Sequence, residues 1–452
     1  MTGTAEIFGT ELVISNTYTF TGTKAAVYTW HGCTFEVSGD ALQSEYTAEE
    51  TPMNEYINVH FALEALRERS KTNGREGPRL LILGPEDAGK SSLAKLLTGY
   101  ATRAARSPVL VNLDVQEGVM SVPGTLTATV FKTLVDVEEG WGAAPMSGPN
   151  GAIPVKLPLV YYFGNERPEE KDGRVYRSQI SRLALAVAGR MGQDPEAREA
   201  GIIIDTPGSL TSTKKQALGY DIIQHIISEF AVSAIICLGS ERLYSDMVKR
   251  FDGTPTASRS LSATASPETI SVIKLAKSGG CVDRDEAFMQ AFRAAQVKAY
   301  FYGNPRLSNG ISLQPRQQQV DFNTLTVWQR IGSFSPGTTS TRGGGTDADD
   351  EEVFLPGGME EETSRVPLPR SQIYERVTTA QLAMRSCILA VMNCQSEAEQ
   401  EEIRDSSVMG FLYVTDVDEA RGRISVLSPV AGRVPNRAIV WAGWPEGVLG
   451  LI

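Results

Sequence analysis

The stretch Gly84-Pro-Glu-Asp-Ala-Gly-Lys-Ser91 constrains the fold most, because it matches the pattern G-x-x-x-x-G-K-[ST]. An apolar run at residues 80–83 precedes it, and a helical apolar pattern at 91–100 follows. Such a loop wraps phosphates with backbone N–H groups at a helix N-terminus. Lys90 adds a cation for the outer phosphates, and the Ser91 hydroxyl is a ligand for Mg²⁺. The sequence therefore predicts a nucleotide site; a glycine-rich turn without a ligand is the weaker alternative.

Buried-type strands alternate with helical patterns from about residue 75 to 305. Such alternation is typical of a mostly parallel sheet covered by helices on both faces. We therefore predict a multidomain α/β protein whose central domain, residues 75–305, is of the P-loop NTPase type. The predicted strands are 80–83, 109–114, 202–205 and 234–238, and the predicted helices are 91–100, 177–190, 216–230 and 284–300.

Strand-like patterns also occupy both ends of the chain. Residues 1–74 hold short apolar runs broken by glycines, followed by an amphipathic helix at 58–70, and they predict an N-terminal β domain. Residues 306–452 predict a β-rich α+β domain. An acidic stretch at 333–364, with eight acidic residues and one basic residue, interrupts it. Since this stretch has few apolar residues, we expect a disordered insertion.

Composition argues against several classes of function. The 452 residues include 43 Lys and Arg against 54 Asp and Glu, a formal charge of −11, which disfavours a general nucleic-acid coat protein. No apolar run approaches the roughly 18 residues of a membrane span, and no signal-peptide pattern follows Met1, so we expect no membrane association. The five scattered cysteines and three histidines form no zinc-type motif, and we expect idle, reduced thiols.

Two aspartates follow predicted strands of the central domain. Asp114 ends the run at 109–114, and Asp205 ends the run at 202–205. The carboxyl ends of parallel strands border the ligand crevice, so either acid could hold Mg²⁺ or accept a proton from an attacking hydroxyl. The alternative for each is a turn or a helix cap. Asp205-Thr-Pro-Gly208 also looks like a GTPase switch motif, but no guanine-specifying Asn-Lys-x-Asp follows.

The residues after the second predicted strand resemble a known family. Asn112-Leu-Asp-Val-Gln-Glu-Gly118, continuing to Ser121-Val-Pro-Gly-Thr125, is similar to the polynucleotide 5′-hydroxyl kinase family. The match is closer to its fungal-like Clp branch, the ATP-binding subunits of the pre-mRNA cleavage and polyadenylation machinery. The resemblance covers nearly the whole chain in order, through further stretches at 5–12, 27–32, 159–164, 241–244, 277–280, 300–303 and 426–429.

This resemblance implies three domains and an ATP·Mg²⁺ site. Lys24 of the N-terminal domain would contact the nucleotide. Asp114 would face the 5′-hydroxyl of RNA in an active kinase. Ser91 is the expected Mg²⁺ ligand, and Asp114 is a second candidate. The expected cofactor-binding residues are Lys24, Gly84, Asp87, Ala88, Gly89, Lys90, Ser91 and Ser92.

Three departures from active members fall on the phosphotransfer apparatus. Glu117 stands where active members have glutamine, and beside phosphates it would repel developing charge. Ser209 stands where they carry a tryptophan, which would stack on an RNA base. Active members also have an arginine-rich helix before 300–303, from which only Arg293 and Lys298 remain, with Met289 and Gln296 where arginine is expected. Loss of a charge-stabilising arginine can slow phosphoryl transfer by orders of magnitude.

A fourth departure concerns the start of the chain. The family has strands before the stretch at 5–12, and one of them carries a glutamate that faces adenine. We therefore expect either a trimmed domain with an unpaired sheet edge or a wrongly assigned start codon.

Three functions remain open at this stage. The first is a nuclear, ATP-binding scaffold subunit for 3′-end cleavage and polyadenylation whose kinase chemistry is lost. Its expected partners are the termination factor that reads the polymerase C-terminal tail and the other cleavage subunits, with RNA met indirectly. The second is an active RNA 5′-hydroxyl kinase, and the third is an unrelated P-loop NTPase. Four lysines are candidate RNA contacts, but a solvated face is the simpler explanation for each: Lys214, Lys215, Lys274 and Lys277.

Overall fold

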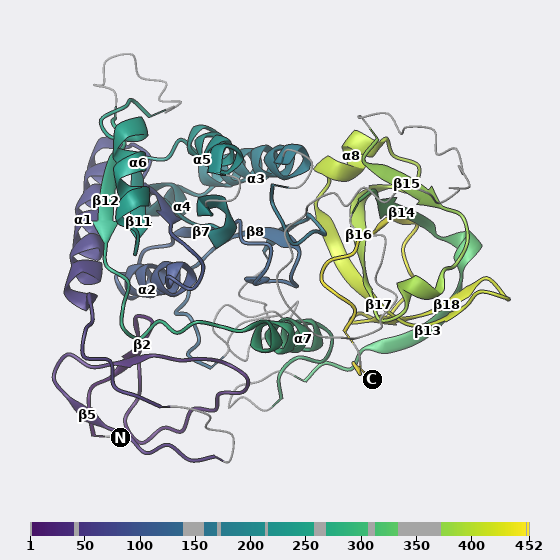
Figure 1. The fold of residues 1–452 in the computed structure, drawn as a ribbon, viewed down its shortest axis with the longest axis horizontal. Helices are drawn as coiled ribbons and strands as arrows, with labels where there is room; N and C mark the ends of the chain where they lie inside the picture. Colours follow the sequence, from purple (N-terminus) through teal and green to yellow (C-terminus); the bar gives the residue numbers. More distant parts are fainter. Residues whose placement is uncertain are drawn as a thin grey trace, which may run out of the picture.

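The computed structural model describes residues 2–39, 45–138, 158–169, 173–212, 216–256, 268–305, 312–332, 372–448 and 450–451. The acidic stretch at 333–364, Lys214 and Lys215 lie outside these residues. The described parts form three regions along the chain: short N-terminal strands, a central sheet between helices, and a C-terminal sheet (Figure 1). No helix in the described ranges combines the length and the apolar character that crossing a membrane requires.

The N-terminal region consists of very short strands joined by turns. β2 (Glu6–Ile7) pairs antiparallel with both β3 (Thr10–Glu11) and β4 (Val27–Tyr28), and β1 (Thr2–Gly3) pairs with β5 (Cys33–Thr34). A small cluster around Ala5, Ile7 and Leu12 is its buried part. The expected β character is therefore confirmed.

The central sheet has seven strands in the order β12-β11-β6-β10-β7-β8-β9. Its first five strands pair in parallel, whereas β8 and β9 extend the sheet antiparallel, so the sheet is mixed and mostly parallel. The strands are β6 (Arg79–Leu83), β7 (Val109–Asn112), β8 (Thr125–Val130), β9 (Leu159–Tyr162), β10 (Ile202–Asp205), β11 (Ala234–Leu238) and β12 (Ser271–Leu275).

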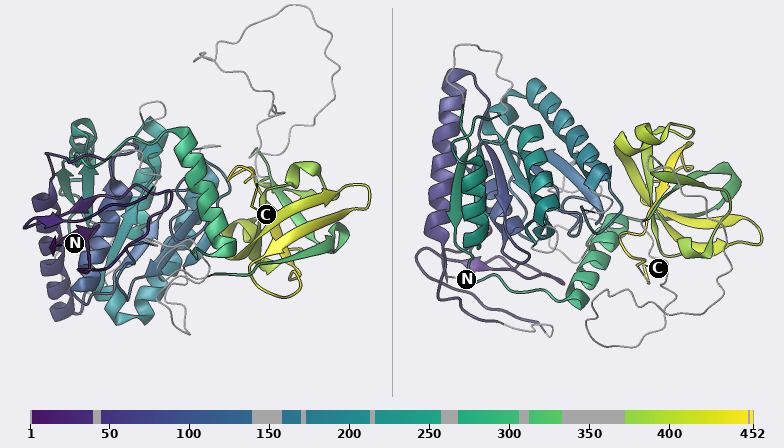
Figure 2. Two further views of the ribbon diagram at one scale, coloured as in Figure 1. Left: turned by 90° about the horizontal axis from the view of Figure 1, so that it is seen from below. Right: turned by 45° about the horizontal axis from the view of Figure 1, so that its top comes forward.

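Helices cover both faces of this sheet, as the alternating pattern predicts (Figures 1 and 2). One core joins the strands to α3 (Arg174–Gln193), α5 (Gln216–Phe230) and α6 (Glu241–Phe251), next to the short α4 (Pro195–Ala200). The other core joins them to α1 (Met53–Asn73) and α2 (Lys90–Arg103). Thus α1 buries its apolar face against the central sheet, although it precedes the proposed boundary at residue 74.

The C-terminal sheet also has seven strands, in the order β13-β18-β17-β16-β19-β14-β15. Neighbours pair antiparallel except β14 and β19, which are parallel. With the short helix α8 (Gln400–Asp405) it confirms the predicted β-rich α+β character. Its strands are β13 (Arg316–Asp321), β14 (Thr326–Arg330), β15 (Tyr374–Val377), β16 (Ile388–Gln395), β17 (Val408–Asp418), β18 (Arg423–Ser428) and β19 (Arg437–Trp441).

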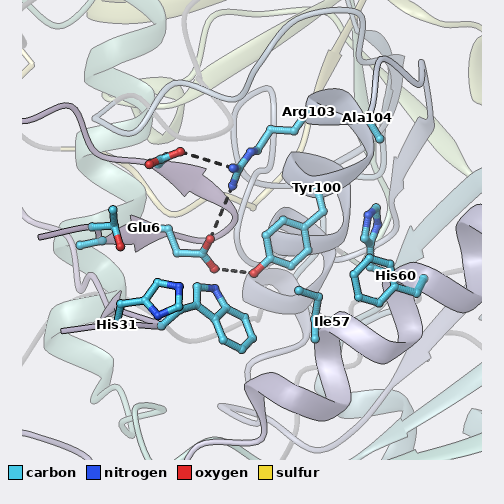
Figure 3. Close-up of a pocket in the computed structure, with 12 residues that line it drawn as sticks. Glu6, His31, Ile57, His60, Tyr100, Arg103 and Ala104 are labelled. Carbon is cyan, nitrogen blue, oxygen red and sulfur yellow. Dashed lines mark hydrogen bonds and ion pairs between the residues drawn. The ribbon is translucent and has the colours of Figure 1, made fainter. Parts of the chain in front are cut away.

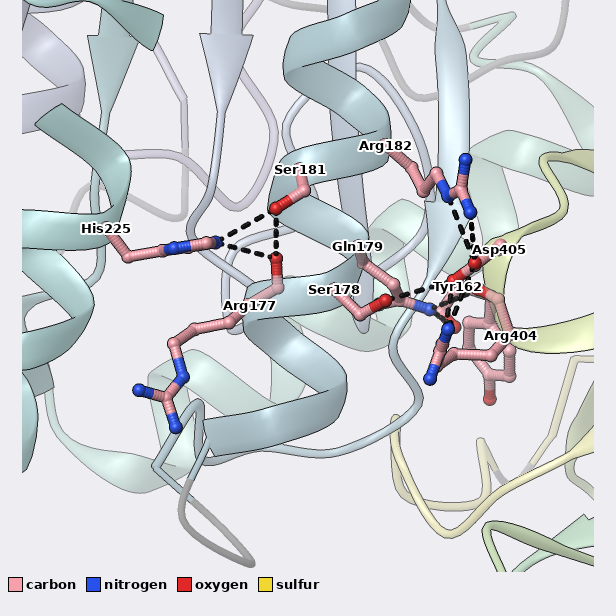
Figure 4. A network of polar contacts seen from close by, with 9 residues as sticks. All are labelled: Tyr162, Arg177, Ser178, Gln179, Ser181, Arg182, His225, Arg404 and Asp405. Atoms are coloured by element: carbon pink, nitrogen blue, oxygen red, sulfur yellow. Dashed lines mark hydrogen bonds and ion pairs between the residues drawn. The ribbon is translucent and has the colours of Figure 1, made fainter. Parts of the chain in front are cut away.

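Two sets of contacts join the C-terminal sheet to the central domain. In the first, α7 (Glu286–Tyr302) lies between them and contributes Val297 and Phe301 to a shared apolar core (Figure 2). In the second, Asp405 of α8 accepts hydrogen bonds from Ser178 Oγ at 3.0 Å and from Arg182 Nε at 3.0 Å on α3 (Figure 4). Burial by itself raises the pKa of the Asp405 carboxyl, but hydrogen bonds from Arg404 and Arg182 lower it overall.

Candidate nucleotide site

The phosphate loop connects β6 to α2, as the motif predicts. Two of its residues have positive φ, Asp87 at 53° and Gly89 at 90°. The glycine is also required sterically, because a Cβ at position 89 would lie 2.6 Å from Cys281 Sγ. The Gly89 carbonyl accepts the Leu93 N–H at 2.9 Å and thereby starts α2. The free N–H groups of the first helical turn therefore face the concave side of the loop.

Lys90 is buried at the start of α2, and its Nζ donates to the Pro85 carbonyl at 2.8 Å. This contact folds the ammonium group back over its own loop, where the outer phosphates of a nucleotide would bind. The hydroxyl of the next residue, Ser91, lies close enough to Asp205 to lower the pKa of that carboxyl. The structure thus brings together the lysine, the hydroxyl and one of the two candidate acids.

Asp205 is the last residue of β10, which lies between β6 and β7 in the sheet. Its Oδ1 accepts the Thr206 N–H at 3.0 Å, and it caps no helix, since the following 3-10 turn η2 (Gly208–Thr211) has Pro207 before it. Burial raises the pKa of Asp205 to about 6, against the effects of Ser91 and Lys90. A carboxylate beside a hydroxyl at the helix N-terminus is a suitable pair of oxygen ligands for Mg²⁺.

Asp114 lies two residues beyond β7. The sequence predicted a strand up to residue 114, but the strand ends at Asn112. The Asn112 side chain fixes it from both sides: Oδ1 accepts the Asp114 N–H at 3.1 Å, and Nδ2 donates to its carbonyl at 2.9 Å. Burial, with the nearby charges of Glu117 and Asp205, raises the pKa of Asp114 to about 7. Lys90 opposes this rise, which shows that the three acids and the lysine share one electrostatic site.

Arg284 is the functional candidate that the sequence did not reveal. Its Nε donates to Asp87 Oδ1 at 2.6 Å, and an Nη donates to Glu117 Oε1 at 2.5 Å. The backbone N–H of Arg284 also donates to Asp87 Oδ2 at 2.9 Å. No local pattern signals this role, because the contact joins positions 167 to 197 residues apart and a lone arginine before a helix is common.

The covering segment, residues 276–285, carries Arg284 over the phosphate loop. N-terminal residues and α1 hold it in place: Tyr56 Oη donates to the Ala276 carbonyl at 2.8 Å, and Tyr46 Oη donates to the Gly279 carbonyl at 2.9 Å. Lys24 Nζ donates to the Asp283 carbonyl at 3.0 Å and lies 4.6 Å from the Phe288 ring centroid. The structure therefore places Lys24 on this segment, one step removed from the loop.

The ion pair between Arg284 and Glu117 changes the expectation for Glu117. The expected repulsion of developing phosphate charge stays a prediction, but Arg284 offsets part of the negative charge of this glutamate. Arg284, which precedes α7, is a further cation near the site besides Arg293 and Lys298 of the helix. Met289 and Gln296 remain uncharged positions of that helix, and Lys298 is exposed.

Arg293 is bound by glutamates that lie outside the phosphate loop. Its side chain is 5% exposed and bonds Glu446 and Glu286, both at 2.6 Å. On the opposite side of the site, Ser209 lies in η2, and its buried Oγ has no hydrogen-bond partner among the described residues. η2 packs tightly on the loop, because a Cβ on Gly208 would lie 2.6 Å from the Glu86 backbone nitrogen.

Other sequence candidates lie outside this constellation. Lys274 pairs with Glu241, and Lys277 lies 3.7 Å from Asp283, as on a solvated face. All five cysteines are free, and the Sγ of Cys281 touches the phosphate loop 3.7 Å from the Ala88 carbonyl. No group of three or more metal-ligating side chains gathers within the part of the chain that the structure describes.

A cavity of about 560 Å³ lies at the other end of α2, between that helix, α1 and the N-terminal strands (Figure 3). Glu6 contacts Tyr100 Oη there, and Arg103 lies 3.7 Å from Glu6. Burial raises the pKa of Glu6. None of the phosphate-loop residues lines this cavity, so it is separate from the nucleotide site.

The strand–loop–helix unit, the mixed sheet and the acid at the end of β10 define a P-loop nucleotide-binding protein. Family models then identify it more closely. The model of the mRNA cleavage and polyadenylation factor CLP1 P-loop matches residues 84–303. The N-terminal β-sandwich domain of polyadenylation factor matches residues 1–70, and the pre-mRNA cleavage complex II protein Clp1 matches residues 313–446. The chain belongs to the Clp1 family.

Curated relatives and solved structures agree with this assignment. The mRNA cleavage and polyadenylation factor clp1 of Aspergillus terreus is 50% identical over 513 aligned residues, which cover 100% of this chain and 91% of the relative. That of Aspergillus niger is 52% identical over 460 residues, covering 97% and 88%. A structure of a wild-type Clp1p–Pcf11p complex has a TM-score of 0.75 at 28% identity, covering 98% of this chain and 91% of that one. A second structure, which concerns the Pcf11p–Clp1p interface and ATP loss in a point mutant, has a TM-score of 0.74.

Proposed function

We propose that this chain is the ATP-binding scaffold subunit of a nuclear pre-mRNA cleavage and polyadenylation factor, with its RNA kinase chemistry lost. The observation that carries the proposal is the phosphate loop in its place between β6 and α2, with Lys90, Ser91 and Asp205 converging and the covering segment lying over it. ATP bound there would contact residues from the loop and from the covering segment, which the N-terminal region holds in place. A nucleotide so placed acts as a structural element between domains.

The donor set suits ATP with Mg²⁺. Lys90 would hold the outer phosphates, and Ser91 with Asp205 or Asp114 would hold the cation. When bound, Mg²⁺ offsets phosphate charge in a site that already contains Asp87, Asp114, Glu117 and Asp205. Bound only to the folded state, ATP adds about 4 kcal/mol of stability at a thousandfold excess over its Kd.

The proposed loss of kinase chemistry rests on the arginines near the site, which are already paired with carboxylates. Phosphoryl transfer needs charge stabilisation that appears in the transition state and not merely in the bound ATP. Arg293 is engaged by Glu446 and Glu286, and Arg284 is engaged by Asp87 and Glu117. No stacking aromatic is present at Ser209. The transferred phosphate would therefore meet few free cations.

One observation favours the alternative, an active RNA 5′-hydroxyl kinase. Asp114 is buried with a pKa raised to about 7, chiefly by burial, and a base with such a pKa is matched to proton abstraction near neutrality. Both functions share the nucleotide site and differ only in turnover.

The interaction partner is proposed from the structural neighbours. Both contain Clp1p together with Pcf11p. We infer that this chain binds the equivalent termination-factor subunit, which reads the polymerase C-terminal tail, and meets RNA through other subunits of the factor.

A single preparation tests the proposal. Purified protein is extracted with acid, and released adenine nucleotide is quantified; about one per chain is expected. The same protein is incubated with γ-labelled ATP and a 5′-hydroxyl oligoribonucleotide, and no labelled RNA is expected. Robust transfer that disappears in Asp114→Ala would establish the kinase instead. Protein that carries no nucleotide and does not bind added ATP would reject both functions.

A further inference from the structure

Arg284 is held by two carboxylates from different parts of the site. Asp87 belongs to the phosphate loop, and Glu117 belongs to the loop that follows β7. The side chains are all largely covered: 25% of Arg284, 17% of Asp87 and 16% of Glu117 remain exposed. Two short, charge-assisted contacts to a covered guanidinium are strong interactions, because little water competes for the donors.

The same guanidinium is the cation of the covering segment best suited to a terminal phosphate. Its planar fork of donors matches phosphate oxygens, which a lysine ammonium does not. Asp87 fixes its position next to the phosphate loop, and Glu117 lies near enough to Asp114 and Asp205 to raise the pKa of both carboxyls. Glu117 and a terminal phosphate would therefore compete for one set of donors.

We propose that Glu117 determines the nucleotide specificity of this site by occupying Arg284. Because the glutamate already occupies one Nη of the guanidinium and offsets its charge, a third phosphate gains less from it, and the site binds ADP nearly as tightly as ATP. The inference rests on the proposed nucleotide site and adds to it a residue that sets the ratio of two affinities. Asp87 plays a different part, since its second oxygen bonds the Arg284 backbone and holds the covering segment in place.

The test is a set of dissociation constants for MgATP and MgADP, measured by calorimetry on the full chain stripped of nucleotide. Glu117→Gln keeps the shape of the side chain and removes the negative charge that engages one Nη of Arg284, which weakens its hold on that donor. We expect it to raise the preference for ATP over ADP about tenfold, equivalent to about 1.4 kcal/mol. Arg284→Lys in the Glu117→Gln background should cancel the gain, because the fork is lost.

Matched variants separate this role from a general change of charge. Asp283→Asn removes one negative charge from the adjacent position, whose side chain is 94% exposed, and should leave the ratio unchanged. Glu117→Asp retains a carboxylate and should keep the wild-type ratio. A Glu117→Gln ratio within twofold of wild type, in protein with an unchanged melting curve, would overturn the proposal. Wild-type protein that binds neither nucleotide would instead refute the proposed function itself.

Discussion

The guanidinium of Arg293 lies 4.6 Å from the ring centroid of Trp444, so helix α7 is fastened to the end of the C-terminal sheet. Trp444 in turn donates its Nε1–H to the Val115 carbonyl at 3.2 Å, one residue after Asp114. The Trp444 carbonyl accepts Tyr162 Oη at 2.7 Å. One tryptophan thus contacts the central sheet, the loop of the candidate acid and the helix that follows the covering segment.

This arrangement predicts that Arg293→Met destabilises the protein through the domain junction. The substitution leaves Glu446 without its buried partner and removes the stack on Trp444. Because Glu446 is 30% exposed, we expect a loss of about 2 kcal/mol, below the 3–5 kcal/mol of fully buried pairs. Thermal denaturation measures it, with Lys298→Met on the exposed face of α7 as the control. Equal melting temperatures for the two variants would contradict the prediction.

The nucleotide site predicts a second loss of stability. Lys90→Ala combined with Ser91→Ala removes the cation and the hydroxyl that converge on the loop. Purified double mutant should carry no adenine nucleotide and melt several degrees below wild type, because the contribution of the ligand is absent. Adding MgATP should raise the melting temperature of the stripped wild type and leave that of the mutant unchanged. A mutant that retains nucleotide would show that another site holds it.

Asp114 predicts a dependence of stability on pH. Its folded-state pKa of about 7 lies above the ordinary value near 4, so the folded state holds a proton between these values that the unfolded state has lost. The free energy of unfolding therefore falls as pH rises from 4 to 7, by up to about 4 kcal/mol for this group. In nucleotide-free protein with chelator, Asp114→Asn should be more stable than wild type at pH 8 and similar at pH 4.

The control for this pH dependence is Asp283→Asn, which alters an exposed carboxylate of the covering segment. Its melting temperature should follow the wild-type curve across the whole range. If Asp114→Asn also runs parallel to wild type, the buried carboxyl is not responsible for the dependence.

The contacts of Asp405 predict how much the junction between α8 and α3 contributes to stability. Asp405→Ala removes the acceptor for Ser178, Arg182 and Arg404 (Figure 4). Since Arg182 is 49% exposed, we expect a loss of about 1 kcal/mol, measured as a fall in melting temperature. Glu397→Ala breaks an exposed pair with Arg376 inside the C-terminal domain and should cost less. A double mutant with Arg182→Ala should be non-additive, and strict additivity would show that the pair is uncoupled.

Deleting residues 337–362 should leave the melting temperature and the nucleotide content unchanged. The flanking strands β14 and β15 are paired antiparallel, with Arg330 opposite Tyr374, and the Ile331 N–H donates to the Ile373 carbonyl at 3.0 Å. Residues 331 and 373 therefore already lie together, and the shorter connection left by the deletion is still long enough to join them. A fall of many degrees would show that residues within the deleted stretch pack on the domain.

Local patterns in the sequence were sufficient for much of this fold. The phosphate loop, β10 and α5 could be predicted because each is a contiguous apolar or helical pattern. The antiparallel strands β8 and β9 were not predicted, since the threonine-rich β8 lacks a continuous apolar run. The pairing of Arg284 with Glu117 and of Arg293 with Glu446 could not be predicted either, because each pair joins residues more than 150 positions apart.

The covering segment has a thermodynamic consequence for the N-terminal region. Lys24, Tyr46 and Glu50 bond the same ten residues that place Arg284 against the phosphate loop. If nucleotide stabilises the docked segment, docking must stabilise bound nucleotide by the same factor, since linkage is reciprocal. A protein that clamps the N-terminal region would then raise the affinity for ATP without touching it. The affinity for the nucleotide would thereby report how completely the surrounding assembly has formed.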